Sequence, residues 1–218
     1  ATRHGNTVVN PGDKLAGMRI IPLVIKKEKM DKVRSLITSP ILEIKPFVLK
    51  KAAVITTGSE VYKGRIQDTF TPVIQDKLAE FGCEMVYHVI CDDDDKMVTE
   101  KINEALTQGV DIVLCTGGMS VDPDDRTPLA IKNTGAEIVT YGAPVLPGAM
   151  FLLSYYREKI PIVGLPGCVM YAKRTIFDLV LPRIMCDEKL HEKDFRLLGQ
   201  GGLCLSCPVC TFPNCGFG

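Results

Sequence analysis

Residues 116–131, with the sequence TGGMSVDPDDRTPLAI, constrain the fold of this chain more than any other stretch. Residues 110–115, just before them, are apolar and rich in β-branched side chains, which predicts a short buried strand. Thr127 and Pro128 are typical of a helix start, with Thr as the cap and Pro in the first turn. A strand, a glycine pair, an acidic loop and a helix start together predict a ligand loop at the carboxyl end of a sheet strand.

The glycine pair and the acidic run predict different chemistry for the two halves of this loop. Gly117 and Gly118 permit positive φ angles and let backbone N–H groups come close to an anion. The aspartates at 122, 124 and 125 would repel an anion unless a divalent cation lies between, or unless one carboxylate takes part in chemistry. A polar surface loop before an ordinary helix has the same spacing, so the residues alone leave both interpretations open.

Strands and helices alternate from residue 49 onward. Short apolar runs predict strands, and apolar residues at helical spacing predict helices. Repeated units of this length need right-handed crossovers, so we expect an α/β fold, a three-layer α/β/α sandwich with a mostly parallel central sheet. The predicted strands are 51–57, 83–91, 110–115, 136–141 and 160–165, and the predicted helices are 68–81, one after 92–95 that reaches 108, one from 127, 149–157 and 168–185.

The chain is predicted to have three segments, which differ in organisation. Residues 1–47 are too few to bury their own apolar faces, so we interpret them as the α+β remnant of an upstream domain that leans on the main body. Residues 48–187 form the α/β domain, and residues 188–218 form a cysteine-rich tail behind a flexible glycine-rich linker. Within the first segment we predict a strand at 18–25, a helix at 27–38 and an extended piece at 40–47.

Three loops are expected to converge at the carboxyl edge of the sheet, where open α/β sheets bind ligands. Glycine and serine offer backbone and hydroxyl donors to a phosphate-like group, while Asp68 and Asp125 offer cation ligands or a general base. The acidic run at 92–95 precedes a helix, so helix capping explains it better than a metal site does. The loops comprise Thr57, Gly58, Ser59 and Glu60; Gly117, Gly118, Met119 and Ser120; and Pro166, Gly167 and Cys168.

In this order, the loops resemble the signature of the molybdopterin-binding domain family over about residues 48–185. That family includes molybdopterin adenylyltransferases, molybdopterin molybdenumtransferases and competence-damage-inducible proteins. The resemblance implies that Asp68 and Asp125 are the functional carboxylates near a bound Mg²⁺ ion, and that Pro147-Gly148 and Pro166-Gly167 border the pterin and phosphate pocket. It implies molybdopterin or its adenylylated form as the bound molecule, molybdate as a partner, and a homo-oligomer, either dimer or trimer.

The branch of the family, and with it the reaction, stays open. The run Gly117-Gly118-Met119-Ser120 resembles the Gly-Gly-Val-Ser of the molybdenumtransferases more than the Gly-Gly-Thr-Gly of the adenylyltransferases, and Cys168 stands where Asn or Ser is common. We expect molybdopterin binding that assists molybdate insertion. The alternatives are a non-catalytic carrier or sensor of the finished cofactor, and a nucleotide pyrophosphatase of the competence-damage-inducible type. The sequence contains no Walker-type phosphate loop and no dinucleotide glycine motif after its first main strand.

The tail carries Cys204, Cys207, Cys210 and Cys215. Two overlapping C-x-x-C steps and a fourth cysteine five residues on predict a site for Zn²⁺ or an iron–sulfur cluster. Reduced, idle thiols on a terminal segment are the alternative. The other cysteines are scattered through periodic segments and are predicted to be small core or edge residues.

Charge and hydropathy narrow the classes of partner. A formal net charge of zero gives no electrostatic reason to expect nucleic acid or an anionic membrane surface. No apolar run approaches the roughly 20 residues of a bilayer span. No basic-then-apolar leader precedes the first predicted strand, so we expect a cytoplasmic protein.

Overall fold

The computed structural model describes residues 1–19, 21–120 and 125–218, and the chain divides into two compact units, residues 1–46 and 47–218. The first unit contains helix α1 (Lys27–Leu36), none of whose residues is buried. The strand predicted at 18–25 is wrong, since no strand occurs among the described residues of that range. Met18 and Leu23 are 100% and 93% exposed, so neither burial nor a partner strand holds this apolar run extended.

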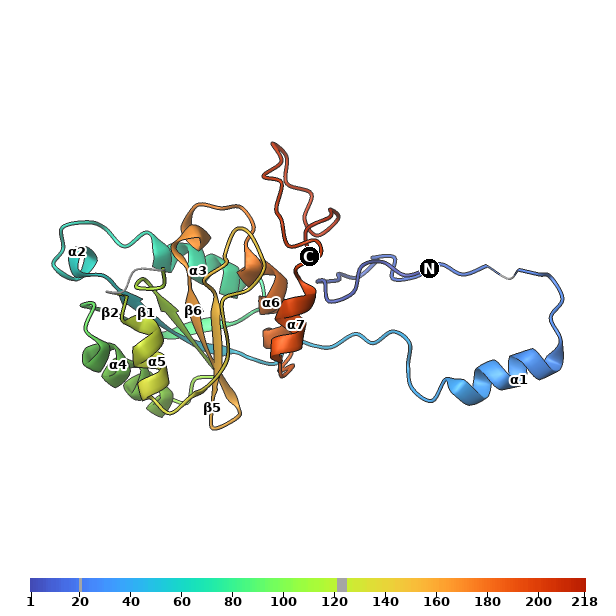
Figure 1. Cartoon of the computed structure of the whole chain (residues 1–218), viewed down its shortest axis with the longest axis horizontal. Coiled ribbons are helices and arrows are strands. Elements are labelled where there is room, and N and C mark those ends of the chain that lie inside the picture. Colours follow the sequence, from blue (N-terminus) through green and yellow to red (C-terminus); the bar gives the residue numbers. More distant parts are fainter. Residues whose placement is uncertain (20, 121–124) are drawn as a thin grey trace. The chain divides into compact units, whose positions relative to one another are not determined.

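The second unit is built around a six-stranded mixed sheet with the strand order β2-β1-β3-β6-β5-β4 (Figure 1). The β2–β1, β1–β3 and β3–β6 pairs are parallel, whereas the β6–β5 and β5–β4 pairs are antiparallel. The predicted three-layer α/β/α fold is therefore confirmed, with an antiparallel hairpin at one side of the sheet. The strands are β1 (Lys51–Thr57), β2 (Glu84–Cys91), β3 (Ile112–Thr116), β4 (Glu137–Tyr141), β5 (Leu152–Tyr156) and β6 (Ile160–Leu165).

Helices cover both faces of this sheet (Figure 1). Helices α4 (Asp95–Thr107) and α5 (Thr127–Asn133) lie on one face. Helix α3 (Phe70–Ala79) packs on the other, where its Lys77 pairs with Asp178 of α6 (Ile176–Met185) at 2.5 Å. Within the described residues, no helix has both the length and the apolarity of a membrane span.

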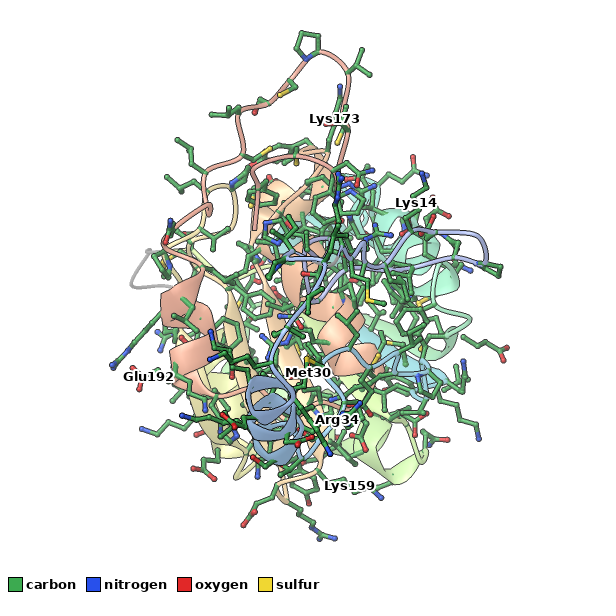
Figure 2. All side chains as sticks on the ribbon, turned by 90° about the vertical axis from the view of Figure 1, so that its right-hand side faces the viewer. Lys14, Met30, Arg34, Lys159, Lys173 and Glu192 are labelled. Carbon is green, nitrogen blue, oxygen red and sulfur yellow. The ribbon has the colours of Figure 1, made fainter. Side chains whose placement is uncertain are left out.

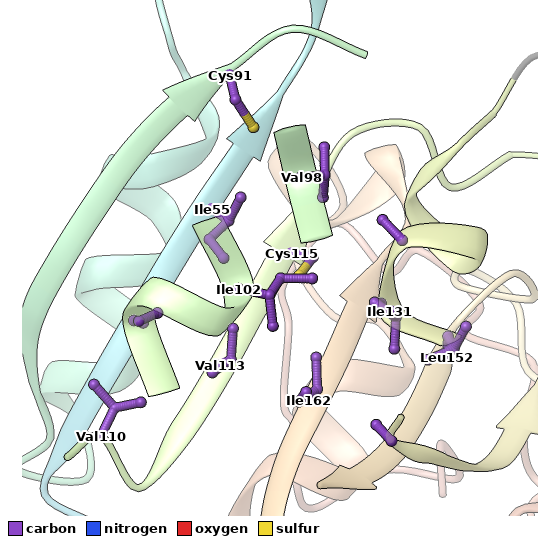
Figure 3. Packing of buried hydrophobic residues seen from close by; sticks show 14 of the residues in the cluster. Ile55, Cys91, Val98, Ile102, Val110, Val113, Cys115, Ile131, Leu152 and Ile162 are labelled. Carbon is purple, nitrogen blue, oxygen red and sulfur yellow. The ribbon is translucent and has the colours of Figure 1, made fainter. Parts of the chain in front are cut away.

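One apolar cluster joins α4 and α5 to the sheet (Figure 3). Ile55, Val113 and Ile162, from three neighbouring strands, share it with Ile102 of α4 and Ile131 of α5, and all five side chains are completely buried. Full burial of an aliphatic side chain of this size contributes about 1.5–3 kcal/mol. The packed strands therefore hold the loops at their ends in fixed positions.

The helix predicted at 149–157 is wrong, because these residues hold strand β5. Leu152 and Leu153 are both completely buried, since β5 lies between two partner strands and has helices over the sheet. Such a strand loses the alternation of polar and apolar residues that identifies a strand in a sequence. Arg157 and Glu158, both with positive φ, lie in the three-residue turn 157–159 into β6, since Tyr156 pairs with Ile160.

The helix predicted at 168–185 begins later than expected. Residues Gly167–Met170 form a short 3-10 turn, and α6 starts only after Thr175. The Thr175 hydroxyl accepts the Phe177 N–H at 3.2 Å, and Asp178 accepts the Thr175 N–H at 2.8 Å. This reciprocal capping box fixes the helix start and leaves residues 171–174 as a loop.

The tail is attached more closely than a flexible linker predicts. After helix α7 (Glu192–Leu197), the glycine-rich segment runs alongside residue 146. Leu146 N–H donates to Gly202 O at 2.7 Å, and Cys204 N–H donates to Leu146 O at 2.8 Å. A Cβ on Gly202 would lie 2.6 Å from the carbonyl oxygen of Pro144, so glycine permits this close approach. The glycine-rich segment, predicted to be a flexible linker, is therefore held against the domain by backbone hydrogen bonds.

Candidate ligand site at the carboxyl edge of the sheet

The loops predicted to converge do follow neighbouring strands. Because β1, β3 and β6 are parallel, the loops at 57–60, 117–120 and 166–168 leave the sheet at the same edge. The β4–β5 hairpin adds the 142–148 loop to that edge, since Tyr141 at the end of β4 pairs with Leu152 at the start of β5. We call these four loops the strand-end site.

The glycine pair crosses the end of β1 at very short range. Gly117 and Gly118 have left-handed φ angles of +85° and +54°. A Cβ on Gly117 would lie 2.2 Å from the carbonyl oxygen of Thr57, and one on Gly118 would lie 2.8 Å from Thr127 Oγ1. Only glycine fits either position.

The cap predicted for helix α5 is wrong by one residue. Arg126 holds the cap position and its side chain makes no capping hydrogen bond. Thr127, the first helical residue, donates its hydroxyl to Gly117 O at 2.9 Å instead. The hydroxyl therefore joins the helix start to the glycine turn, and it lies 3.4 Å from the Thr57 hydroxyl.

Asp125 bends back over the glycine loop. Its Oδ2 accepts the Ser120 N–H at 2.5 Å, and the Tyr141 hydroxyl donates to Ser120 O at 3.2 Å. Burial, and then the negative charge of Asp125, raise the pKa of Tyr141, so the phenol lies within electrostatic reach of this carboxylate. Residues 121–124, which include the other two aspartates of the predicted acidic loop, lie outside the described residues.

Met119 faces the core rather than a ligand. Its side chain is 3% exposed and belongs to the apolar cluster that joins α4 and α5 to the sheet. A Cβ on Gly164 of β6 would lie 2.5 Å from Met119 Cε, so the methionine fills the space above this glycine. Only the backbone of Met119 remains for the binding role that the sequence predicts.

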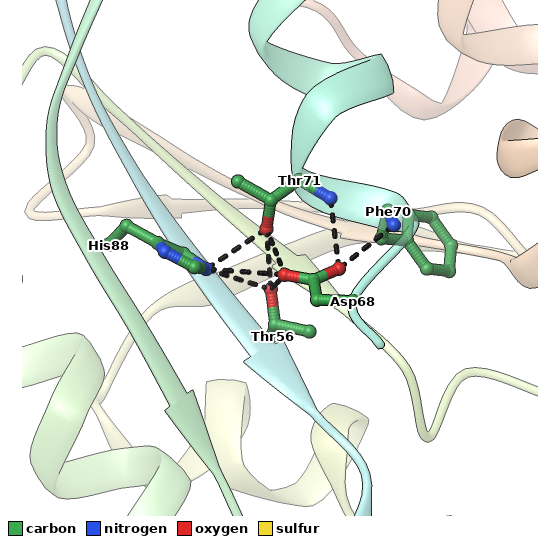
Figure 4. A network of polar contacts seen from close by, with 5 residues as sticks. All are labelled: Thr56, Asp68, Phe70, Thr71 and His88. Atoms are coloured by element: carbon green, nitrogen blue, oxygen red, sulfur yellow. Dashed lines mark hydrogen bonds and ion pairs between the residues drawn. The ribbon is translucent and has the colours of Figure 1, made fainter. Parts of the chain in front are cut away.

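Asp68 lies in a dense polar network at the start of α3 (Figure 4). Its Oδ1 accepts the N–H groups of Phe70 at 2.8 Å and Thr71 at 3.1 Å, and its Oδ2 accepts the Thr71 hydroxyl at 2.5 Å. His88 Nε2 lies 2.9 Å from Thr71 Oγ1 and 3.3 Å from Thr56 Oγ1. Burial raises the pKa of Asp68, but these hydrogen bonds together lower it by more than burial raises it. The net pKa of Asp68 therefore lies below the ordinary value. In this conformation the carboxylate, one residue before the cap position Thr69, accepts N–H groups at the start of α3 and has its acceptor sites engaged.

Ser59 already has carboxylate partners. It begins the short helix α2 (Ser59–Tyr62), with Gly58 at the cap position and Glu60 exposed. Ser59 N–H donates to Asp93 Oδ2 at 2.8 Å, and the Ser59 hydroxyl donates to Asp92 Oδ1. The two donors that the sequence predicts for a phosphate are thus occupied by the loop after β2.

The acidic run at 92–95 divides between two roles. Asp94 accepts the Met97 N–H at 2.8 Å and caps α4, so the capping interpretation is confirmed for this residue. Asp92 and Asp93 reach Ser59 on the neighbouring loop, and the Ser59 hydroxyl lowers the pKa of Asp92. The Asp92 and Asp93 side chains therefore neighbour the strand-end site without being helix caps.

The two Pro-Gly turns differ in what they offer a ligand. Pro147 follows a cis peptide bond and accepts the Ile176 N–H at 3.1 Å, and a Cβ on Gly148 would lie 2.5 Å from Ile176 Cγ2, so this turn is packed against α6. Gly167, by contrast, is exposed, and no atom lies within 4 Å of the place a Cβ would take. Burial raises the pKa of the adjacent Cys168 thiol, which therefore stays protonated at neutral pH. Of the two turns, the one at Gly167 is therefore the one that a ligand can approach closely.

The candidate metal ligands are not assembled. Cys204, Cys207, Cys210 and Cys215 line one cavity. Over residues 1–19, 21–120 and 125–218, however, no three His, Cys, Asp or Glu side chains are arranged to hold a metal ion. Within these described residues, the four tail cysteines are therefore not preformed as a Zn²⁺ or iron–sulfur site.

Several residues of this edge were not predicted from the sequence. Thr56, Thr71 and His88 surround Asp68, and Tyr141 reaches Ser120. Thr56 lies on β1, His88 on β2 and Thr71 on α3, and only the strand register, which pairs Val54 with His88, together with the packing of α3 brings them together. The register between parallel strands cannot be read from one strand at a time.

The sequence is similar to a known protein family over the segment that contains these loops. The family described as "Probable molybdopterin binding domain" matches residues 53–185, more than half of the chain. A CinA-like protein of Mycobacterium avium (strain 104) is 34% identical over 93 residues, which are 42% of this chain and 21% of that protein. A CinA-like protein of Mycobacterium tuberculosis (strain H37Rv) is also 34% identical over 93 residues, or 22% of its length. The match thus spans about a fifth of these relatives.

Solved structures show the same fold. The molybdopterin biosynthesis enzyme MoaB from Thermus thermophilus matches with a TM-score of 0.51 and 22% identity, over 62% of this chain and 92% of that one. The tungsten cofactor synthesizing protein MoaB from Pyrococcus furiosus matches with a TM-score of 0.51 and 23% identity, over 62% and 92% of the two chains. The matched family segment contains the six strands, apart from the first two residues of β1, and the loops that they position. The chain therefore belongs to the molybdopterin binding domain family.

Proposed function

We propose that the strand-end site binds molybdopterin, or its adenylylated form, in the biosynthesis of the molybdenum cofactor. The observation that carries this proposal is the glycine turn at 117–118, which crosses Thr57 at a distance only glycine allows and is followed by Asp125, bound to the Ser120 N–H at 2.5 Å. This turn lies within the family match, and the similar structures from Thermus and Pyrococcus are named for molybdopterin and tungsten cofactor synthesis.

Within this site, the two predicted carboxylates are proposed to have different tasks. Asp125 lies on the loop, half-buried, and its described hydrogen bond is to one backbone N–H, so the carboxylate retains acceptor capacity for a proton or a cation. Asp68 is engaged by two N–H groups and a hydroxyl and fixes the start of α3. We therefore assign the chemical role to Asp125 and a positioning role to Asp68.

Mg²⁺ would fit beside Asp125 rather than in a cage of protein ligands. Mg²⁺ is usually held by one or two carboxylates together with substrate phosphates and waters. Asp125 offers such a carboxylate, and a phosphate-bearing ligand would supply the rest. When bound, the ion would neutralise phosphate charge at this edge.

The backbone next to Gly167 supports the same site from the opposite side. Gly167 is exposed and has open space where a side chain would point, so a ligand can approach its backbone closely. Ser59 would join the site only after releasing Asp92 and Asp93, because their carboxylates hold both of its donors. Ligand binding is therefore expected to compete with the Ser59–Asp93 hydrogen bond.

The favoured activity is assistance to molybdate insertion, and the CinA-like relatives give a specific reason to test a second one. Incubating the chain with molybdopterin, ATP and Mg²⁺, with and without molybdate, separates the possibilities. Loss of free molybdate with formation of finished cofactor supports insertion, and AMP release without a pterin product supports a pyrophosphatase. Stoichiometric pterin binding without turnover identifies a carrier. No pterin binding under any of these conditions would refute the proposal.

A further inference from the structure

The cysteine-rich tail encloses a cavity of about 470 Å³ that lies mostly beyond the family match. One wall is the 171–174 loop with Pro147, and the other is the tail itself. Ligand pockets typically have volumes of about 300–1,000 Å³, so this cavity has the size of a binding site. We call it the tail cavity; its wall from the tail includes Leu205, Cys207, Cys210, Phe212 and Phe217.

The tail wall is fixed at both ends, which makes the cavity a built feature. Gly218 N–H donates to Gly201 O at 3.0 Å and closes the tail into a loop. Phe217 is 7% exposed, and a Cβ on Gly218 would lie 2.5 Å from Leu179 Cδ2, so the end of the loop rests on α6. Lys173, which Figure 2 labels beside the tail, donates its Nζ to Pro208 O at 3.0 Å and so ties the 171–174 loop to the tail.

The lining is positively charged. It contains Lys173 and Arg174 and no aspartate or glutamate. Arg174 shares its carboxylate, Asp178, with Lys77, at 2.8 Å and 2.5 Å, so two cations face one anion. Lys173 forms no ion pair among the described residues. Glu80 is a further negative charge within electrostatic reach of Arg174. Lys77, Arg174 and Lys173 against Asp178 and Glu80 therefore leave about one positive charge around this cavity, in a chain whose net charge is zero.

The lining also offers apolar and aromatic surface for a ring. The Arg174 guanidinium lies 4.9 Å from the centroid of the Phe212 ring, which is the geometry of a cation–π contact. Tyr171 is 77% exposed and Leu205 is 77% exposed, although both line the cavity. Aromatic surfaces of this kind stack on flat heterocycles, and adjacent cations bind phosphate.

We infer that the tail cavity binds a phosphate-bearing aromatic metabolite of mononucleotide size, with Lys173 and Arg174 at the phosphate and Tyr171 and Phe212 at the ring. A cation is a poorer occupant, because two cationic side chains line the cavity and its thiols are not arranged as a metal-binding group. The exposed Cys207 and Cys210 lie in the lining, where a bound ligand would cover them.

AMP is the probe for this inference, used on the full chain with calorimetry. AMP is expected to bind more tightly than adenosine, which lacks the phosphate, and than inorganic phosphate, which lacks the ring. Lys173→Gln and Tyr171→Ala change exposed side chains and are each expected to weaken AMP binding by about tenfold or more, from a lost charge-assisted hydrogen bond and a lost stacking surface respectively. Lys132→Gln, on the exposed side of α5, has the same charge change and is expected to leave AMP binding unchanged.

Alkylation of the cysteines gives a second readout. Saturating AMP is expected to slow the reaction of Cys207 and Cys210 with iodoacetamide in the wild type, but not in Lys173→Gln at the same AMP concentration. AMP binding that both cavity variants leave intact would place the nucleotide elsewhere, for instance in the strand-end site, and would overturn the inference while sparing the proposed function. A stoichiometric metal held by the four tail cysteines in anaerobically purified protein would overturn it as well.

Discussion

The substitution Gly117→Ala tests the most closely packed contact of the strand-end site. Gly117 has a φ of +85°, and an added Cβ would lie 2.2 Å from Thr57 O and 2.7 Å from Thr57 Oγ1. The left-handed conformation costs an L-residue about 1–2 kcal/mol. Displacing the end of β1, a buried strand, adds about 1–3 kcal/mol, as overpacking does elsewhere. The free energy of unfolding should therefore fall by about 2–5 kcal/mol.

Gly135→Ala is the matched control. Gly135 has almost the same φ, +84°, but no atom lies within 4 Å of the place that a Cβ would take. It should lose only the conformational part, about 1–2 kcal/mol. The difference between the two variants thus isolates the overlap with Thr57 and cancels the effect of alanine on the unfolded chain.

Equilibrium unfolding in urea, followed by far-UV circular dichroism, measures both variants. We expect Gly117→Ala to be less stable than Gly135→Ala by about 1–3 kcal/mol. An equal loss of unfolding free energy in the two variants would mean that the glycine turn is not in close contact with the end of β1. The described geometry of the strand-end site would then be wrong.

Four further predictions follow from the same geometry. Asp125→Asn should lower turnover about 10²–10⁴-fold while pterin binding persists; unchanged turnover would reduce Asp125 to a residue of the helix start. Thr127→Val should lower the free energy of unfolding by about 1–3 kcal/mol, because Gly117 O loses its donor, and Thr127→Ser should restore most of it. Burial raises the pKa of Asp194, but the His191 N–H and Arg183 lower it by more, so the net pKa in the folded protein lies below 3.8. The ionised Asp194 therefore stabilises the fold fully above pH 3.8, and this stabilisation is lost as the pH falls through the pKa of the folded protein. Arg183→Gln should reduce this acid loss, measured by urea unfolding across the acid range. Light scattering should show a dimer or a trimer, and a monomer at micromolar concentration would contradict that expectation.

The parallel part of the fold could be predicted because its strands are short, apolar and bounded by glycine. Strands β1 and β6 match their predicted ranges, 51–57 and 160–165. The hairpin through β5 could not be recognised, because its residues are buried on both faces and its turn at 157–159 lacks the Asn-Gly or Gly signal of such turns. The late start of α6 did have a signal, Thr175 followed by Asp178, which a helical interpretation of the whole range obscured.

The position of the site at the carboxyl edge of the sheet could be predicted from the order of strands and loops. The contacts between the residues of the site could not. Ser59 was expected to be free for a phosphate, yet it binds Asp92 and Asp93 from another loop. Asp68 was expected to be free for chemistry, yet Phe70 and Thr71 at the start of α3 donate hydrogen bonds to it. Both outcomes depend on the relative position of neighbouring loops, which residue spacing within one loop does not determine.

Pterin binding by a Gly167→Leu variant tests the central claim most directly. The exposed Gly167 has no atom within 4 Å of a Cβ position and no left-handed φ, so a leucine fits the folded chain but fills the open turn of the strand-end site. Fluorescence titration with molybdopterin should show saturable binding to the wild type and at least a tenfold weaker affinity in the variant, which is about 1.4 kcal/mol or more. The urea midpoint should stay the same. Equal pterin affinity in the two proteins would show that molybdopterin does not occupy this edge of the sheet.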